Sequence, residues 1–171
     1  MEQKLTPLQS EMKYILAILF LLTTVGCSSV VDDEDNVKEY VKVGDQLPLF
    51  SVETVNGDGT TAMFTTAQLT GETIIVLFHT SCSDCQRELP RLNNYYLQHR
   101  SELGFQMVAI SREETAESIA AFWQAQHLSI PYSAQTDRRI YNLFASSVIP
   151  RVYFCSPEGT VTKICVEKVE L

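Results

Sequence analysis

The sequence predicts an α/β domain with a central mixed β-sheet flanked by helices, and three features of the 171-residue chain lead to this prediction. Thr73–Phe78 (TIIVLF) and residues 105–110 are short, continuously apolar runs, a pattern typical of central strands that are buried on both faces. Segments with helical spacing of apolar residues follow both runs. Residues 152–155 and Val161–Val166 then form an antiparallel hairpin pattern around a Pro-Glu-Gly turn, which closes the sheet.

The N-terminal side of the domain is predicted to be a β-hairpin. Folded structure is expected to begin near Val41. Residues 47–55 alternate loosely between apolar and polar side chains, and the turn sequence NGDG at 56–59 separates them from residues 60–64. Asn-Gly and Asp-Gly pairs favour the tight turns that join antiparallel strands, so these two segments should pair.

Three helices are expected between the strands. The first covers residues 86–100, and Pro90 should kink it because proline lacks an N–H and collides with the preceding turn. Ser111 is expected to cap the second helix, with Glu114 in its positively polarised first turn. Residues 138–144 predict a third, shorter helix.

The charge of the chain argues against a nucleic-acid partner. Its formal net charge is −8, whereas phosphate binding needs clustered Lys and Arg. Apolar residues make up 45% of the chain, which is enough to fill the core of one compact domain. The acidic block DDED at 32–35 is interpreted as part of a solvated, flexible spacer rather than as a recognition site.

The N-terminus is interpreted as a signal peptide that covers residues 1–26. Residues 14–25 are uncharged, but twelve residues of helix span only about 18 Å, which is short of the ~30 Å hydrocarbon core of a membrane. The segment fits the hydrophobic region of an export signal instead. Met12 is followed by Lys13, and translation from there would give a signal peptide of more ordinary length.

The sequence TVGC at 24–27 resembles the lipobox of bacterial lipoproteins, in which the cysteine is acylated after cleavage. Cys27 would then be the lipidated first residue of the mature chain, residues 27–40 an acidic tether, and residues 41–171 the folded domain. Several acyl chains on one cysteine hold a protein durably on a membrane. The resemblance implies a cell-envelope lipoprotein of a Gram-negative bacterium that faces the periplasm or is displayed on the surface. Ordinary secretion and an uncleaved anchor are the alternatives.

The motif Cys82-Ser83-Asp84-Cys85 is the candidate catalytic site. It follows the buried run Thr73–Phe78 and opens a helix, where unpaired N–H groups and the helix dipole favour a thiolate and lower the pKa of Cys82. The three-residue spacing lets both sulfurs meet within one turn. We expect Cys82 to attack a substrate disulfide and Cys85 to resolve the mixed disulfide, with no metal and no cofactor other than this redox-active pair.

A zinc half-site is the alternative interpretation of these cysteines. It would need a second pair of ligands, and Cys155, Cys165 and His79 are the available residues. Both spare cysteines fall within predicted strands rather than on a ligand loop, so redox chemistry is favoured. The two lie out of register across their hairpin, which argues for buried core thiols rather than a mutual disulfide.

Three segments resemble the TlpA/ResA-like branch of exported thiol-disulfide oxidoreductases in the thioredoxin superfamily. VGDQLPLF at 43–50 is similar to the opening VGD-x-x-P-x-F of that branch. The motif at 82–85 is followed by Glu88 and Pro90, as in its C-x-x-C-x-x-E-x-P pattern. Val-Ile-Pro at 148–150, just before a strand, is similar to its cis-proline segment.

The resemblance covers residues 41–166 and implies a thioredoxin-like fold with defined site residues. Glu88 would accept a proton from the buried Cys85, and an exposed helix carboxylate is the alternative. Pro150 would be cis, which leaves the backbone of Ile149 free to pair with an incoming peptide beside the attacking cysteine. The expected partners are protein thiols and disulfides as substrates and a membrane thiol carrier as electron donor.

The chain departs from this family at several positions. Ser81 stands where an aromatic residue usually precedes the first cysteine, and Val76 stands where thioredoxin buries an acid. His79 would stabilise the attacking thiolate or simply lie beside the strand end. Arg151 follows the cis-proline position and would attract an acidic partner. The family usually adds a final helix after the last strand, whereas this chain ends at Leu171, so a missing C-terminal helix is expected.

These features favour an exported, membrane-tethered enzyme that reduces protein disulfides. Asp84 between the cysteines should oppose thiolate formation and so disfavour a strongly oxidising disulfide. A peroxiredoxin-like peroxidase is one alternative, but it would need Thr three residues before the attacking cysteine, where His79 stands. A non-catalytic binding lipoprotein on the same scaffold is the other, motivated by the missing aromatic residue and the short C-terminus.

Overall fold

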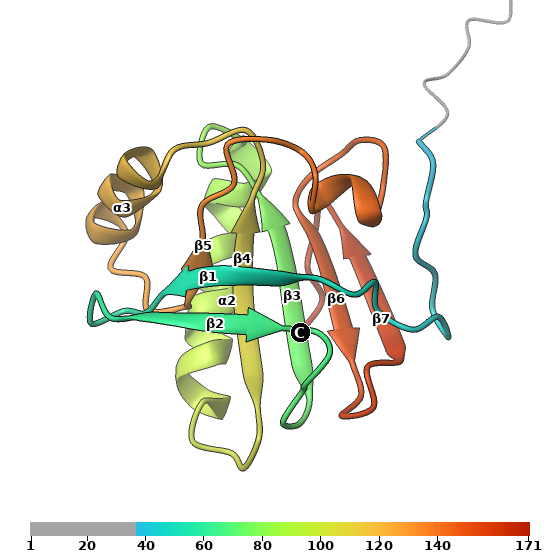
Figure 1. Cartoon of the computed structure of the whole chain (residues 1–171). Helices are drawn as coiled ribbons and strands as arrows, with labels where there is room; N and C mark the ends of the chain where they lie inside the picture. The colour runs from blue at the N-terminus through green and yellow to red at the C-terminus, as the bar shows by residue number, and fades with distance from the viewer. Residues whose placement is uncertain (1–36) are drawn as a thin grey trace, which may run out of the picture. The chain divides into compact units, whose positions relative to one another are not determined.

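A seven-stranded mixed sheet forms the centre of the computed structural model, which describes residues 37–171. The strand order is β2-β1-β5-β4-β3-β6-β7, and α2 runs behind the sheet in the view of Figure 1. The mixed α/β sheet predicted from the sequence is confirmed. The elements are β1 (Ser51–Val55), β2 (Thr61–Thr65), β3 (Thr73–Phe78), α2 (Ser83–His99), β4 (Gln106–Ser111), α3 (Ala116–Ala125), β5 (Tyr132–Ser133), the 3-10 turn η1 (Tyr141–Leu143), β6 (Arg151–Cys155) and β7 (Val161–Val166).

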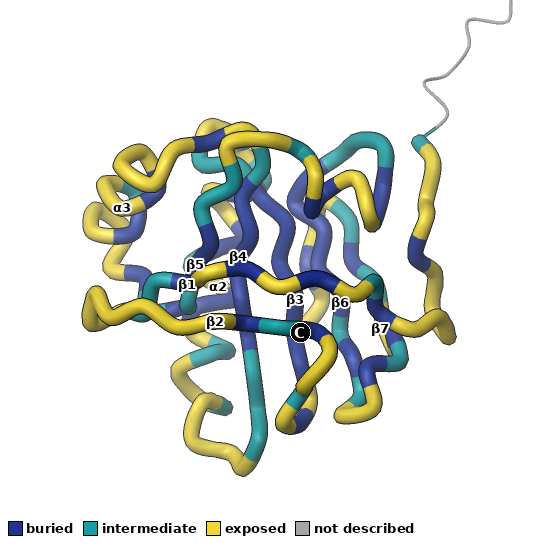
Figure 2. The backbone as a smooth tube through the Cα atoms, viewed as in Figure 1, coloured by how far each residue is buried: buried dark blue, intermediate teal, exposed yellow. Residues whose placement is uncertain are grey.

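The strand β3 occupies the middle of the sheet, and all six of its residues are buried. It pairs parallel with β4 and antiparallel with β6, so Val76 lies between Ala109 on one side and Val152 on the other. Figure 2 shows β3 as a largely dark-blue, buried stretch of backbone. The cysteine motif that follows Phe78 therefore lies at the C-terminal end of a central, buried strand.

The strands β1 and β2 form the predicted N-terminal hairpin. They pair antiparallel around the turn at 56–59, with Val52 opposite Phe64. β1 joins the rest of the sheet through one residue pair, Val55 opposite Tyr132 in β5. β5 has only two residues, too few to give a recognisable sequence pattern, and it is absent from the predicted elements.

The predicted cap of α3 is wrong. Thr115 caps this helix, and its hydroxyl accepts a hydrogen bond from the Ser118 N–H at 3.3 Å. Ser111 is instead the last residue of β4, where its hydroxyl accepts a hydrogen bond from the Gln135 N–H at 2.9 Å. Serine hydroxyls bond to nearby backbone groups in caps and in turns alike, so the residue type could not distinguish the two positions.

The other two helices differ from prediction at their ends. α2 begins three residues earlier than expected because Cys82 serves as its N-cap, and the helix continues through Pro90. Leu89 lies on its buried side, within the core. The helix expected at 138–144 is reduced to the single 3-10 turn Tyr141–Leu143, because the chain then leaves the helical path to run beside the N-terminal segment.

The residues before β1 pack against the domain. The compact unit begins at Val37, four residues before the expected start of folded structure. The side chains of Val41 and Leu47 are buried. The Leu47 N–H donates a hydrogen bond to the carbonyl of Gly159 at 2.9 Å, which fastens this segment to the turn between β6 and β7.

The features that predict export lie outside the described part of the chain. They are the signal sequence at 1–26, Cys27 and the acidic block at 32–35. Between Val37 and Leu171 no helix is long and apolar enough to cross a membrane. Membrane attachment through Cys27 therefore stays a prediction.

Candidate active site

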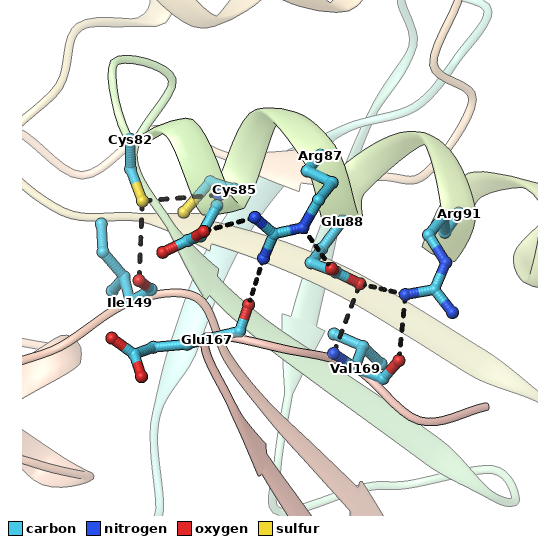
Figure 3. Close-up of polar contacts among 9 residues, drawn as sticks. Cys82, Cys85, Arg87, Glu88, Arg91, Ile149, Glu167 and Val169 are labelled. Carbon is cyan, nitrogen blue, oxygen red and sulfur yellow. Dashed lines mark hydrogen bonds and ion pairs between the residues drawn. The ribbon is translucent and has the colours of Figure 1, made fainter.

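Cys82 lies at the N-terminus of α2, in the short loop that follows the C-terminal end of β3. Its backbone is extended, and its sulfur accepts a hydrogen bond from the Cys85 N–H at 3.4 Å, so this cysteine itself caps the helix. Its thiol in turn donates to the carbonyl of Ile149 at 3.5 Å. Figure 3 shows both sulfurs on the side of α2 that faces this carbonyl. The structure thus brings together three of the site residues that the sequence predicts.

The segment that faces Cys82 is the predicted cis-proline loop. The Ile149–Pro150 peptide bond is cis, as the family resemblance implies. Pro150 leads directly into β6, which pairs with β3, so the loop is held next to the strand that carries the cysteine motif. The carbonyl of Ile149 thus lies 3.5 Å from the Cys82 sulfur, and the pairing of this backbone with a substrate peptide stays a prediction.

Cys85 is fully buried one turn into α2, and its environment opposes ionisation. Burial raises the pKa of the Cys85 thiol well above its usual range, and the hydrogen bond and charge of Cys82 raise it further. A hydrogen bond with the backbone of His79 and the charge of Arg112 lower this pKa only in part. Cys85 is therefore a thiol at neutral pH, and its predicted attack on a mixed disulfide would require a proton acceptor.

Glu88 is only 1% exposed, so the alternative of an exposed helix carboxylate is wrong. One oxygen accepts from Arg87 Nε at 2.9 Å, and the other accepts from Arg91 Nη1 at 2.6 Å and from the Val169 N–H at 3.3 Å (Figure 3). Burial alone would raise the pKa of Glu88, but these hydrogen bonds and the charge of Arg91 outweigh burial and lower it. Glu88 is an anion at neutral pH and can accept a proton. Its hydrogen bonds go to these groups and not to the cysteines, so proton transfer from Cys85 stays a prediction.

Asp84, between the two cysteines, is paired with a cation. Arg87 Nη1 lies 2.5 Å from Asp84 Oδ1, and Arg87 Nη2 donates to the carbonyl of Glu167 at 3.2 Å. Such a solvent-accessible pair contributes little to stability. Its effect on the site is electrostatic, because the guanidinium offsets part of the negative charge that Asp84 places beside the thiols.

Glu114 lies next to the candidate site, whereas the sequence pattern places it only in the first turn of a helix. Its buried side chain accepts hydrogen bonds from the Thr80 N–H at 3.0 Å, from the Thr80 hydroxyl, and from the Ser118 hydroxyl at 2.7 Å. His79 Nδ1 lies 3.8 Å from it. Glu114 therefore holds the short loop that leads into Cys82. No local signal could have found this contact, because Thr80 and Glu114 are 34 residues apart.

The expectation that Arg151 attracts an acidic partner is wrong. The side chain is fully buried, and its Nη1 donates to both carboxylate oxygens of Glu39, at 2.6 and 2.7 Å. The N-terminal segment of the chain therefore supplies the acidic group itself.

The other candidate ligands do not form a metal site in the described part of the chain. His79 Nδ1 accepts a hydrogen bond from the Ser81 N–H at 3.1 Å. Cys155 and Cys165 are buried free thiols in out-of-register positions, and burial raises the pKa of Cys155 to about 12. Among residues 37–171, no group of three or more His, Cys, Asp or Glu side chains is arranged to hold a metal ion.

The domain that carries this site is similar to known proteins. A profile of the AhpC/TSA family matches residues 43–164. The thiol-disulfide oxidoreductase ResA of Bacillus subtilis (strain 168) is 27% identical over 128 residues, which cover 74% of this chain and 69% of that protein.

Solved structures share the fold. A solution structure from Bacteroides thetaiotaomicron, described as a candidate protein disulfide isomerase, has a TM-score of 0.70 at 22% identity and covers 78% of this chain and 84% of its own. A thiol:disulfide interchange protein of the thioredoxin family from Chlorobium tepidum TLS has a TM-score of 0.57 at 23% identity, over 71% of this chain and 86% of its own.

The fold and these relatives define a thiol-disulfide oxidoreductase with the thioredoxin fold. The chain belongs to the AhpC/TSA family, since the family profile covers most of the described residues. The predicted thioredoxin-like fold, the resemblance to the ResA-like branch and the predicted enzyme class are confirmed. The individual roles of Cys82, Cys85, Glu88, Ile149 and Pro150 stay predictions.

Replacing Glu88 by Gln should lower stability at neutral pH more than in acid. The hydrogen bonds from Arg87, Arg91 and the Val169 N–H hold the pKa of Glu88 in the folded chain below the ordinary value of a glutamate, so its carboxylate stabilises the fold at pH values above that ordinary value. This contribution is lost as the pH falls through the folded pKa. We expect Glu88→Gln to reduce the free energy of unfolding by about 1–3 kcal/mol at neutral pH, with a smaller difference in acid, as measured by urea unfolding.

The matched control is Glu53→Gln, at an exposed position of β1, which should change the free energy of unfolding by less than about 0.5 kcal/mol. If Glu88→Gln caused the same loss at neutral and at acidic pH, the charged hydrogen bonds of Glu88 would not be its contribution to stability.

Proposed function

We propose that the protein reduces disulfide bonds of exported proteins through the dithiol of Cys82 and Cys85, while a lipid on Cys27 tethers it to a membrane. The observation that carries this proposal is the position of the Cys82 sulfur, which caps α2 and lies 3.5 Å from the carbonyl of Ile149. Cys82 is partly exposed, so a disulfide that approaches along the cis-proline loop can reach it.

The proposed reaction is thiol–disulfide exchange in two steps. The Cys82 thiolate attacks one sulfur of a substrate disulfide, a mixed disulfide forms, and the departing substrate sulfur takes up a proton. Cys85 then loses its proton and attacks the Cys82 sulfur, which forms the Cys82–Cys85 disulfide and releases the second substrate thiol. The substrate gains two electrons and two protons. An external dithiol donor, proposed to be a membrane thiol carrier, returns the protein to its reduced form.

Deprotonation of the buried Cys85 is the demanding part of the second step. Glu88, three residues further along α2, is proposed as the proton acceptor, directly or through water. Its lowered pKa makes it a weak base, so it would pass the proton on to solvent rather than keep it.

The environment of the pair supports a reductant rather than an oxidant. A strongly oxidising disulfide arises where the reduced form is stabilised as a thiolate of low pKa. Here burial raises the pKa of Cys85, and Asp84 adds negative charge that Arg87 offsets only in part. Neither effect stabilises the reduced form, so the Cys82–Cys85 disulfide should be difficult to reduce and its dithiol a good electron donor.

The proposed location rests on the N-terminal sequence. The lipobox-like TVGC at 24–27 overlaps the end of the hydrophobic segment at 14–25, which is too short to span a membrane as a helix, and this supports export followed by acylation. The protein would then work in the envelope of a Gram-negative bacterium, on the periplasmic side or at the surface.

The Cys85→Ser variant should trap a mixed disulfide. Cys82 can still attack in this variant, but no second thiol is left to resolve the adduct, so a complex with a disulfide-bearing peptide should accumulate. Intact mass under non-reducing conditions measures it, and the Cys82→Ser variant is the matched control that should give no adduct.

Absence of an adduct with Cys85→Ser would contradict the proposed role of Cys82 and Cys85 in thiol–disulfide exchange. Consumption of hydrogen peroxide by the reduced wild-type protein, without adduct formation, would then indicate the peroxiredoxin-like alternative. A protein that neither traps a peptide nor consumes peroxide would instead be a binding module.

The redox potential of the pair should lie near that of thioredoxin, about −270 mV, rather than near the about −120 mV of a strong periplasmic oxidant. Equilibration with dithiothreitol and glutathione buffers, read out by mass after thiol alkylation, measures this potential. A value near −120 mV, within about 30 mV, would make the protein a disulfide donor and reverse the proposed direction of electron flow.

The Cys27→Ser variant should lose membrane attachment. Expressed as the full chain in a Gram-negative host, the wild-type protein should be found in the membrane fraction and the variant outside it, because acylation needs the cysteine thiol. The matched control is Ser28→Ala, which leaves the cysteine in place. A variant that stays on the membrane would contradict lipidation of Cys27.

A further inference from the structure

The loop that faces Cys82 has a backbone conformation that its own sequence does not favour. Val148 has a φ of 71°, in the left-handed region that β-branched residues rarely adopt. Such a conformation persists only where the surroundings hold it. Here hydrogen bonds to carbonyl groups hold it: Tyr141 Oη donates to Val148 at 2.7 Å, and Arg151 Nε donates to Ser147 and Val148 at 3.0 Å each.

Arg151, which makes two of these hydrogen bonds, depends on a carboxylate for its position. Its side chain is fully buried, and its Nη2 has no hydrogen-bond partner within residues 37–171. Burial alone would lower the pKa of Arg151, but its hydrogen bonds with the Glu39 carboxylate and the negative charge of that carboxylate help to outweigh burial, and the pKa is raised. A buried guanidinium that loses its counterion is strongly unfavourable, so Glu39 is needed to keep Arg151 in place.

Glu39 is itself fixed, because its segment runs antiparallel to the residues just before the loop. The Lys38 N–H donates to Ser146 Oγ at 2.8 Å, and the Ser146 N–H donates to the carbonyl of Lys38 at 3.0 Å. Glu39 lies opposite Ala145 in this bridge. The segment is therefore fastened to the backbone on which the loop begins, and its carboxylate reaches Arg151 at the other end of the loop.

We propose that Glu39 is a positioning residue for the redox reaction. Through Arg151 it holds the carbonyls of residues 147 and 148, and so it sets the place of the Ile149 carbonyl beside the Cys82 sulfur. The N-terminal segment thereby supports the surface that receives a disulfide-bearing peptide. This inference rests on the proposed function, in which Cys82 attacks a disulfide held along this loop.

The test compares two substrates of the Glu39→Gln variant, which removes the charge of the pair and keeps the size of the side chain. The full-length protein is reduced and then mixed with a peptide that carries an intramolecular disulfide, or with 2-hydroxyethyl disulfide. Acid quenching and mass spectrometry follow the loss of free thiols. The small disulfide has no peptide backbone to pair with the loop, so it reports on the chemistry of Cys82 alone.

We expect the second-order rate constant with the peptide to fall about tenfold in Glu39→Gln, while the limiting rate at saturating peptide and the reaction with the small disulfide change less than about twofold. Glu39→Asp keeps the carboxylate and should restore most of the peptide reaction. Glu53→Gln, which removes an exposed carboxylate on β1, should leave both reactions unchanged.

A milder variant covers the case in which Glu39→Gln does not fold. Ser146→Ala removes only the hydroxyl that accepts from the Lys38 N–H, and leaves the charge pair intact. It should slow the peptide reaction about threefold and spare the small disulfide.

Two results would overturn the positioning role while leaving the proposed function in place. One is an unchanged second-order rate constant with the peptide in a folded Glu39→Gln variant. If that variant does not fold, an unchanged rate constant in Ser146→Ala has the same meaning. The other is an equal loss with both disulfides, which indicates general damage to the site. A wild-type protein that reacts with neither disulfide overturns the proposed function itself, and the positioning role with it.

Discussion

Burial of β3 on both faces is the constraint on which the rest of the molecule depends. Pairing with β4 and β6 satisfies its backbone groups, and its side chains share one hydrophobic core with Cys85, Leu89 and Leu92 of α2. The chain that leaves β3 then enters α2 through the cysteine motif, and the chain that enters β6 comes from the cis-proline loop. Cys82 and Ile149, 67 residues apart in sequence, meet because the strands that carry them are neighbours. The candidate redox site is therefore formed by the pairing of these strands.

Three carboxylates support this site from different directions, and each has its partners. Glu88 lies on the helix behind the thiols, Glu114 holds the loop that leads into Cys82, and Glu39 holds the loop opposite. A buried or half-buried charge is tolerated only when it is paired or hydrogen-bonded, and all three meet this condition. Cys85 differs, because its surroundings favour the neutral thiol. The charged groups around the two cysteines are thus paired, whereas ionisation is unfavourable for Cys85, the thiol proposed to react second.

The sequence predicts the parts of the structure that have a strong local pattern. The apolar run of β3, the glycine-rich turn of the first hairpin and the cysteine motif are each readable within about ten residues, and the cis Pro150 follows from a short family motif. The strand β5 has only two residues, too few to show the alternation of apolar and polar side chains that identifies a strand. The pair formed by Glu39 and Arg151 joins residues 112 apart, and its existence depends on which segments the fold places side by side. Local patterns report on neighbours along the chain, so contacts of this kind stay hidden until the strand order is known.

The bridge between residues 38–40 and the loop before Pro150 would limit where a lipidated form of the protein can act. If Cys27 carries acyl chains, only eleven residues lie between it and Glu39, and the twelve residue steps from Cys27 to Glu39 reach about 40 Å when fully extended. Because the chain becomes fixed beside the redox site rather than at a remote point of the domain, this reach applies to the site itself. The thiols would work in a thin layer of solvent next to the bilayer. Polypeptides that are emerging from the membrane or held at its surface would pass through that layer, and proteins that diffuse far from it would not.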